Sequence, residues 1–218
     1  MYVMAFDGIM GAGKTAGMSI MAQYYRQKSG CTLYSNYGLR GSKLFTNFEQ
    51  FIDVAQQPSS IICLDEAHSD LDSRSSNTNV AKYLTHIFYY LRKLRATVFL
   101  STPSILSLDS RVRGVTQIYC QVEKSKKYFK YNMYDLQSEK YLRTYRIQKD
   151  KAFGILPQVY YTHKMVVPME YPQSKEEFYQ IISLLKEVND NYYIQTKEPH
   201  VPGLQVPEGG SWDSVIVQ

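Results

Sequence analysis

Eight residues near the N-terminus form a complete phosphate-binding loop. Residues 8–15 read GIMGAGKT, which fits the pattern G-x-x-x-x-G-K-[ST] without substitution. A short apolar run, 2–6, precedes the loop, and a helix-like run, 16–27, follows it. Strand, glycine-rich turn and helix start together place backbone N–H groups where they can surround phosphates at a helix N-terminus. The chain is therefore expected to bind a nucleotide through its phosphates.

The residue types of the loop divide the expected contacts with ATP. Lys14 is expected to reach the β- and γ-phosphates, and the hydroxyl of Thr15 to ligate Mg²⁺. The other predicted nucleotide contacts are made by Gly8, Gly11, Ala12, Gly13 and Ala16.

A second motif places two acids at the end of an apolar run. Residues 60–68 read SIICLDEAH, the pattern of a buried parallel strand that delivers carboxylates at its C-terminal end. Asp65 is expected to hold Mg²⁺, directly or through water, and Glu66 to orient or deprotonate an attacking water. The alternative is that both acids only cap the next segment. A catalytic Glu66 favours hydrolysis of ATP over transfer of its phosphate to a small acceptor.

Composition fits a soluble chain of moderate size. The 218 residues allow one domain with modest additions, and 44% hydrophobic with 21% charged residues is ordinary for a globular protein. The net charge of +5 permits contact with nucleic acid without demonstrating it. Cys31, Cys63 and Cys120 are too far apart for a zinc site or a disulfide framework. No apolar run reaches 18 residues, so no transmembrane segment is expected, and Met1 leads directly into the first predicted strand.

Strands and helices alternate in the first half of the chain. The sequence predicts strands at 2–7, 31–37, 60–65 and 97–101, and helices at 16–28, 47–57 and 80–95, with a polar loop at 69–79. This alternation predicts a three-layer α/β domain with a mostly parallel sheet.

The second half shows a different pattern. It predicts strands at 115–122, 127–135, 140–147 and 161–167, a helix at 174–188, and an extended Pro- and Gly-rich tail from 196. The strands at 127–135 and 140–147 are expected to pair as an antiparallel hairpin. We therefore divide the chain into an ATPase core, 1–122, an extension of the same domain, 123–195, and the tail, 196–218. The hairpin alternates Tyr with Lys and Arg, which fits DNA binding or an exposed sheet whose long side chains cover apolar surface.

The segment after the two acids resembles a known group of ATPases. Residues 89–95 (YYLRKLR), the strand ending in Ser101-Thr102, and residues 105–113 (ILSLDSRVR) carry the resemblance. The layout is similar to that of the zonular-occludens-toxin-like ATPases of phages and, more widely, of the FtsK/HerA translocases that include viral genome-packaging ATPases. The resemblance covers about residues 2–122 and implies the RecA-like P-loop NTPase fold with an added strand and a catalytic glutamate (ASCE).

The resemblance also implies roles for four further residues. Thr102 falls where such ATPases keep a polar sensor of the γ-phosphate, although Pro103 stands where the family usually has Gln. Arg92 matches an arginine that members carry before this strand. Arg111 and Arg113 follow the strand and are candidates for an arginine finger donated to a neighbouring subunit. Surface solvation remains the alternative for Arg92, Arg111 and Arg113, with Arg92 then lying on an exposed helix face.

A small member without a membrane segment is similar to the ATPases that package viral genomes. The implied partners are double-stranded DNA, further copies of the chain in a homo-oligomeric ring, and a capsid vertex (portal) or viral membrane protein. The implied location is the host cytoplasm or the packaging vertex of the virion. Because such a motor ignores sequence, DNA is expected to be bound through its phosphates, with Arg40, Lys43 and Arg74 as candidates. The alternative for each of the three is a solvated charge on a loop.

Three other function classes remain open at this point. A toxin-like assembly or secretion ATPase would move protein or a filament instead of DNA. A P-loop nucleoside kinase is disfavoured because the zinc-binding cysteine pairs of thymidine kinases are missing. A binding module that uses ATP as a switch would bind the nucleotide and scarcely turn it over.

Overall fold

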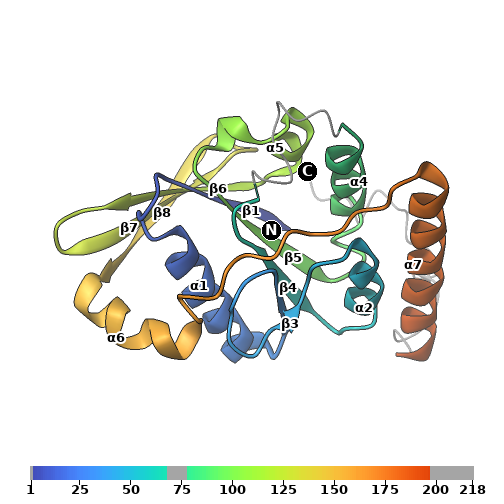
Figure 1. Ribbon diagram of the computed structural model, residues 1–218, viewed down its shortest axis with the longest axis horizontal. Coiled ribbons are helices and arrows are strands. Elements are labelled where there is room, and N and C mark those ends of the chain that lie inside the picture. Colours follow the sequence, from blue (N-terminus) through green and yellow to red (C-terminus); the bar gives the residue numbers. More distant parts are fainter. Residues whose placement is uncertain (1, 68–77, 197–218) are drawn as a thin grey trace, which may run out of the picture.

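Eight strands form one sheet in the order β3-β2-β4-β5-β1-β6-β7-β8 in the computed structural model, which describes residues 2–67 and 78–196 (Figure 1). From β3 to β6 all neighbours run parallel, and β6-β7-β8 run antiparallel. The strands are β1 (Val3–Asp7), β2 (Thr32–Ser35), β3 (Lys43–Leu44), β4 (Ser60–Leu64), β5 (Ala96–Thr102), β6 (Ile118–Lys124), β7 (Tyr128–Asp135) and β8 (Lys140–Gln148).

Helices cover both faces of the sheet and bury two separate cores. One core joins α1 and α6 to side chains such as Met4 and Phe6 of β1, and the other joins α2, α4, α5 and α7 to the alternate side chains, such as Ile62 and Val98. Figure 1 shows these two helical layers on opposite sides of the sheet. The helices are α1 (Lys14–Ser29), α2 (Phe51–Ala55), α4 (Thr78–Phe88), α5 (Ser110–Val115), α6 (Lys149–Val159) and α7 (Lys175–Gln195), with 3₁₀ turns η1 (Phe48–Gln50) and η2 (Ile105–Ser107).

The strand order confirms the predicted three-layer fold with its mostly parallel sheet. β5 lies between β1, which carries the P-loop, and β4, which ends in the acids. The carboxyl ends of these three parallel strands meet at one edge of the sheet, and the antiparallel hairpin β7-β8 extends the sheet beyond β6. The division into a core and an extension stays a prediction, because all eight strands belong to the one sheet.

Several predicted elements differ from the observed ones. The helix expected at 80–95 ends at Phe88. The last apolar residues of the predicted helix, Leu91 and Leu94, lie in hydrogen-bonded turns after it and are still buried in the core. No strand forms at 161–167; this segment runs beside the loop after β2, where the Val167 N–H donates to the Asn36 carbonyl at 2.8 Å.

Helix α6 was not predicted, because Gly154 and Pro157 interrupt its short apolar pattern. The predicted helix at 174–188 continues to Gln195. In the described parts of the chain, no helix combines the length and apolar character that a membrane span requires.

Candidate active site

The P-loop leaves β1 and enters α1 at the carboxyl edge of the sheet. Gly13 directly precedes α1 with φ 102°, a left-handed conformation that suits glycine. The Lys14 side chain is buried, and its Nζ donates to the Gly8 carbonyl at 2.8 Å and to the Ile9 carbonyl at 3.5 Å. The ammonium group therefore lies against the backbone of the loop, where an anion held by the loop would meet it.

The Asp65 carboxylate accepts hydrogen bonds from one residue of α1 and one residue of β5. The Thr15 hydroxyl donates to Asp65 Oδ2 at 2.9 Å, and the Ser101 hydroxyl donates to Asp65 Oδ1. The carboxylate is buried, so these bonds replace the water that it gives up. The two residues predicted to bind Mg²⁺, Thr15 and Asp65, are thus brought together at the sheet edge.

Asn36 fixes the backbone of Asp65 from the end of β2. The Asp65 N–H donates to Asn36 Oδ1 at 2.8 Å, and Asn36 Nδ2 donates to the Asp65 carbonyl at 3.1 Å. The side chain of Asn36 is buried. Sequence reasoning missed this residue, because the predicted strand at 31–37 runs through Asn36, whereas β2 ends at Ser35.

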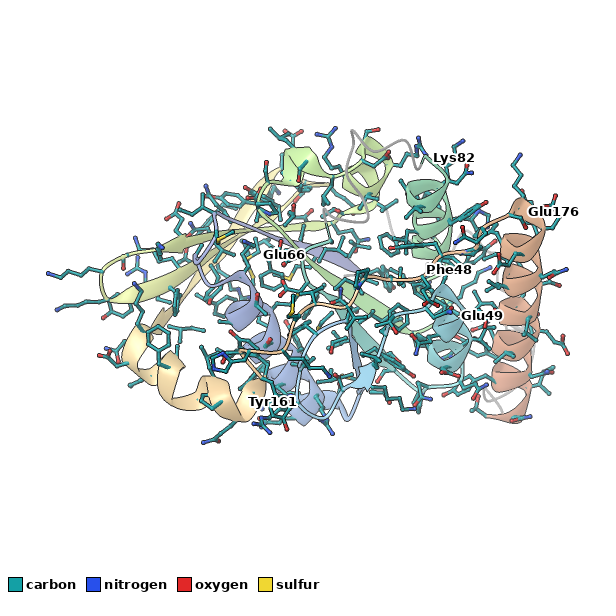
Figure 2. The ribbon with its side chains drawn as sticks, viewed as in Figure 1. Phe48, Glu49, Glu66, Lys82, Tyr161 and Glu176 are labelled. Carbon is teal, nitrogen blue, oxygen red and sulfur yellow. The ribbon has the colours of Figure 1, made fainter. Side chains whose placement is uncertain are left out.

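Glu66 lies one residue beyond Asp65, in a strained turn. Its φ of 53° is unusual for a non-glycine residue and turns the chain sharply after β4. The Glu66 N–H donates to the Ser101 hydroxyl at 3.2 Å, and the Ala67 N–H to the Ser101 carbonyl at 2.9 Å. Figure 2 shows Glu66 in the middle of the molecule, far from Glu176 on α7 and from Tyr161 below α1. Ser101 therefore holds both acids in place.

Mg²⁺ fits the donor set at this site. A hydroxyl and a carboxylate oxygen lie together, and Mg²⁺ prefers oxygen ligands, commonly one or two carboxylates completed by substrate phosphates and water. Within residues 2–67 and 78–196, no three His, Cys, Asp or Glu side chains cluster in a way that could hold a metal. Thr15 and Asp65 stay the residues predicted to hold Mg²⁺, and their oxygen atoms fit that role.

The hydroxyl of Thr102, the predicted sensor, is directed away from the two acids. It donates to the Ser104 carbonyl at 2.9 Å and lies 3.1 Å from Ser107 Oγ. Successive side chains of a strand point to opposite faces, so Ser101 turns toward Asp65 and Thr102 turns away. The sensor role of Thr102 stays a prediction.

The three predicted arginines lie in two different places. Arg92 is exposed just before β5, at the sheet edge opposite the P-loop, and the seven residues of β5 span roughly 20 Å. Any contact of Arg92 with a nucleotide would therefore be with one held by another subunit. Arg111 and Arg113 lie on α5, where Arg111 Nε is 3.5 Å from Asp109 Oδ1. Their roles in trans stay predictions.

Two of the three predicted DNA contacts can be placed. Arg40 Nε donates to the Pro157 carbonyl at 2.6 Å, and its guanidinium lies 3.8 Å from the centre of the Tyr161 ring. Lys43 is exposed on β3. Arg74 lies outside the described residues. Arg40 is thus engaged within the fold, where it holds the loop after β2 against the end of α6.

The β-hairpin packs directly on the P-loop, a contact that the sequence did not predict. The Tyr131 hydroxyl donates to the Gly13 carbonyl at 3.1 Å, and burial raises the pKa of Tyr131. A Cβ on Gly13 would lie 2.7 Å from the Phe129 ring, and a Cβ on Gly17 would overlap the Tyr131 ring. The two glycines therefore allow β7 to approach the start of α1 closely.

An open cleft of about 520 Å³ lies beside the P-loop, along β6. Tyr119 lines it, and burial together with the nearby Asp7 carboxylate raises the pKa of Tyr119 to about 12, so its hydroxyl stays protonated near neutral pH. The other lining residues include Asp7, Gly8, Pro103, Gln121 and Lys124.

The family model described as zonular occludens toxin (Zot) matches residues 43–165, more than half of the chain. The chain belongs to this family. The match begins after the P-loop and includes both acids, α5 and the hairpin. A search of curated proteins finds no match.

Solved structures support the fold assignment. The N-terminal domain of zonular occludens toxin from Neisseria meningitidis is 15% identical with a TM-score of 0.52, covering 73% of this chain and 98% of that one. A second solved ATPase domain is 11% identical with a TM-score of 0.52, covering 78% and 85%. The genome packaging NTPase B204 from Sulfolobus turreted icosahedral virus 2, in complex with ATP-gammaS, is 12% identical with a TM-score of 0.49, covering 66% and 96%. The first two likenesses show the P-loop NTPase fold.

Proposed function

We propose that this chain hydrolyses ATP as the subunit of an oligomeric motor that moves double-stranded DNA into a viral capsid. The observation that carries the proposal is the convergence of Lys14, Thr15, Asp65 and Glu66 at one sheet edge, with the Thr15 hydroxyl bonded to Asp65 at 2.9 Å. The two halves of this arrangement come from the P-loop and from the end of β4, which are neighbours only in the folded chain.

The residues of the site have distinct roles in the proposed reaction. The backbone N–H groups of the P-loop bind the phosphates, and Lys14 exchanges its bonds to the loop carbonyls for bonds to phosphate oxygens. Thr15 and Asp65 would hold Mg²⁺, which would supply positive charge to neutralise the phosphates. Glu66 orients the attacking water and takes its proton. Asn36 and Ser101 keep both acids in position by fixing their backbone and the Asp65 carboxylate.

A neighbouring subunit is expected to complete the site. The contacts described for Lys14 and Asp65 are with the P-loop backbone, Thr15 and Ser101, and they include no arginine. An arginine supplied in trans, Arg111 or Arg113, would stabilise the charge that develops on the phosphate, an effect worth about 10³–10⁵ in rate. Hydrolysis would then depend on assembly of the ring.

The family match favours a second candidate, an ATPase of phage assembly or secretion that moves protein or a filament. The matched model is that of zonular occludens toxin. This candidate shares the ATP site with the first and differs in the cargo alone. A cargo of DNA is the part of the proposal that needs its own test.

The test is steady-state ATP hydrolysis with and without long double-stranded DNA, at low salt and over a range of protein concentrations. A DNA motor predicts strong stimulation by DNA and a rate that rises more than linearly with protein concentration. Hydrolysis that ignores DNA would favour the assembly ATPase. Phosphorylation of an added nucleoside would replace both candidates with a kinase.

A further inference from the structure

Most of the net positive charge of the chain can be located in two short segments. Residues 123–130 and 146–150 contain six basic side chains and two acids, Glu123 and Asp150, a net charge of +4 (six minus two) compared with +5 for all 218 residues. We call the six basic residues the basic end: Lys124, Lys126, Lys127, Lys130, Arg146 and Lys149.

Strand pairing brings these two segments together. Lys130 of β7 lies opposite Arg146 of β8, and the Lys149 N–H donates to the Lys127 carbonyl at 3.0 Å. None of the six forms an ion pair with another described residue. Glu123 lies opposite Lys130 across β6-β7, and Asp150 follows Lys149, so the two acids leave a local excess of four positive charges. An external polyanion would stabilise that excess.

The basic end lies at the same sheet edge as the P-loop. The β6-β7 turn follows the carboxyl end of β6, and Figure 1 shows this turn projecting from the body of the molecule beyond the P-loop and above α6. Side chains alternate along β7: Phe129 and Tyr131 are buried against α1, and Lys130 points to the other face with its partner Arg146. Lys124 pairs with Phe129, and Lys149 Nζ lies 5.5 Å from the centre of the Phe129 ring, so these two lysines lie on the face that packs toward the P-loop. The charges are therefore spread over both faces of the ribbon, next to the proposed site of hydrolysis.

We propose that the basic end binds the phosphate backbone of double-stranded DNA. This inference rests on the proposed DNA motor and names the surface that holds its cargo. The charges are spread along a ribbon instead of converging on one point, which fits a linear polyanion better than a single nucleotide. Lys130 lies on β7, and Lys126 and Lys127 lie in the turn that leads into it. Because Phe129 and Tyr131 of β7 pack on Gly13 and Gly17, DNA bound there would contact an element that touches the P-loop.

This surface includes part of the hairpin, where the sequence allowed DNA binding, and excludes the predicted contacts Arg40 and Lys43. Arg40 was a predicted DNA contact, and its guanidinium is occupied by the Pro157 carbonyl and the Tyr161 ring. Lys126 and Lys127 are exposed in a turn and have no such partners among residues 2–67 and 78–196.

The test compares two charge reversals of equal size. K126E/K127E alters the basic end, and K175E/K186E alters two exposed lysines of α7, on the far side of the molecule (Figure 1). Binding of a labelled DNA duplex is measured by fluorescence anisotropy between about 50 and 200 mM salt, a range over which phosphate contacts strongly affect affinity. Unfolding in urea confirms that each full-length variant folds.

The inference predicts that K126E/K127E weakens DNA binding by roughly tenfold or more at low salt. The slope of log affinity against log salt should fall by about two, one for each lost phosphate contact. Basal ATP hydrolysis should be unchanged and its stimulation by DNA lost, and K175E/K186E should behave as wild type.

Three results would overturn the inference, and they separate it from the proposed function. DNA binding that survives K126E/K127E, or that falls equally in both double variants, rejects the basic end and leaves the motor standing. A variant that loses affinity for ATP and keeps its affinity for DNA assigns these lysines to the nucleotide. Wild-type protein that hydrolyses ATP and binds no duplex removes the DNA cargo itself, and this inference with it.

Discussion

The Tyr131 hydroxyl, on β7, donates a hydrogen bond to the carbonyl of Gly13, the last residue before α1, at 3.1 Å. This bond joins the antiparallel hairpin to the phosphate-binding loop. The hairpin is thus part of the wall that shapes the P-loop, and its removal would expose Gly13 and Gly17 as well as the hairpin's own buried face.

Replacing Tyr131 with Phe removes this hydroxyl and keeps the ring. We expect the variant to lose about 0.5–1.5 kcal/mol of unfolding free energy, the usual net contribution of one hydrogen bond. Urea unfolding measures the loss, with Tyr145→Phe, at an exposed position of β8, as the control. A loss as large in the control as in Tyr131→Phe would show that the bond to Gly13 contributes nothing specific.

Gly17 and Gly154 offer a matched pair of helix glycines. A Cβ on Gly17 would overlap the Tyr131 ring, whereas a Cβ on Gly154 of α6 would meet nothing within 4 Å. Gly17→Ala should therefore lower the unfolding free energy by about 1–3 kcal/mol through overpacking, and Gly154→Ala should raise it by up to about 1 kcal/mol. Thermal unfolding of the two variants should move in opposite directions; a stabilised Gly17→Ala would contradict the close packing of β7 on α1.

Asn36→Ala tests whether the amide of Asn36 positions the acids. The change removes the partners of the Asp65 N–H and carbonyl, and each buried group left unsatisfied costs about 1–3 kcal/mol. We expect lower stability and slower hydrolysis with ATP binding largely kept, since the P-loop itself is untouched. Asn191→Ala, at an exposed position of α7, should change neither. Full turnover in Asn36→Ala would show that Asp65 and Glu66 hold their positions without it.

Tyr34 gives a prediction for alkaline pH. Burial, and next the Asp53 carboxylate, raise the pKa of Tyr34 from its usual 10 to about 12, and its hydroxyl has no partner within the described residues. Because the folded-state pKa is the higher one, any stability tied to protonated Tyr34 is complete below pH 10 and is lost as pH rises through 12.

The urea midpoint of the wild type should therefore fall between pH 10 and 12, and that of Tyr34→Phe should fall less. At about pH 7 the substitution should change stability by less than about 1 kcal/mol, because it removes an unpaired hydroxyl. Identical pH dependence in the two proteins would reject the role of Tyr34.

The parts of the site that lie within one short stretch of sequence could be predicted, and the contacts between distant stretches could not. The P-loop and the strand that ends in Asp65 and Glu66 were predictable, because each is a contiguous pattern with a fixed chemistry. The partners of Asp65 were not, since Asn36 and Ser101 reach it only when β2 and β5 lie on either side of β4. Ser101 and Thr102 are adjacent in sequence, and only the orientation of β5 determines which hydroxyl faces the acids.

The same limit applies to the second half of the chain. The alternation of Tyr with Lys and Arg predicted the strands of the hairpin, and these strands are observed. Their packing on α1 depends on Gly13 and Gly17, which leave room for the rings of β7. A glycine in the sequence does not indicate which distant residue will fill that room. The predicted strand at 161–167 is wrong, because this apolar segment packs along the loop after β2 without strand pairing.

The most direct test of the proposed mechanism is steady-state ATP hydrolysis by Glu66→Gln with Mg²⁺, next to wild type and Glu123→Gln. Glu123 is an exposed glutamate near the P-loop, so its variant controls for the loss of one nearby charge. We predict that Glu66→Gln binds ATP as wild type does and hydrolyses it about 10²–10⁴ times more slowly, while Glu123→Gln keeps its activity. Wild-type turnover in Glu66→Gln would contradict the assignment of the catalytic base and, with it, the proposed mechanism.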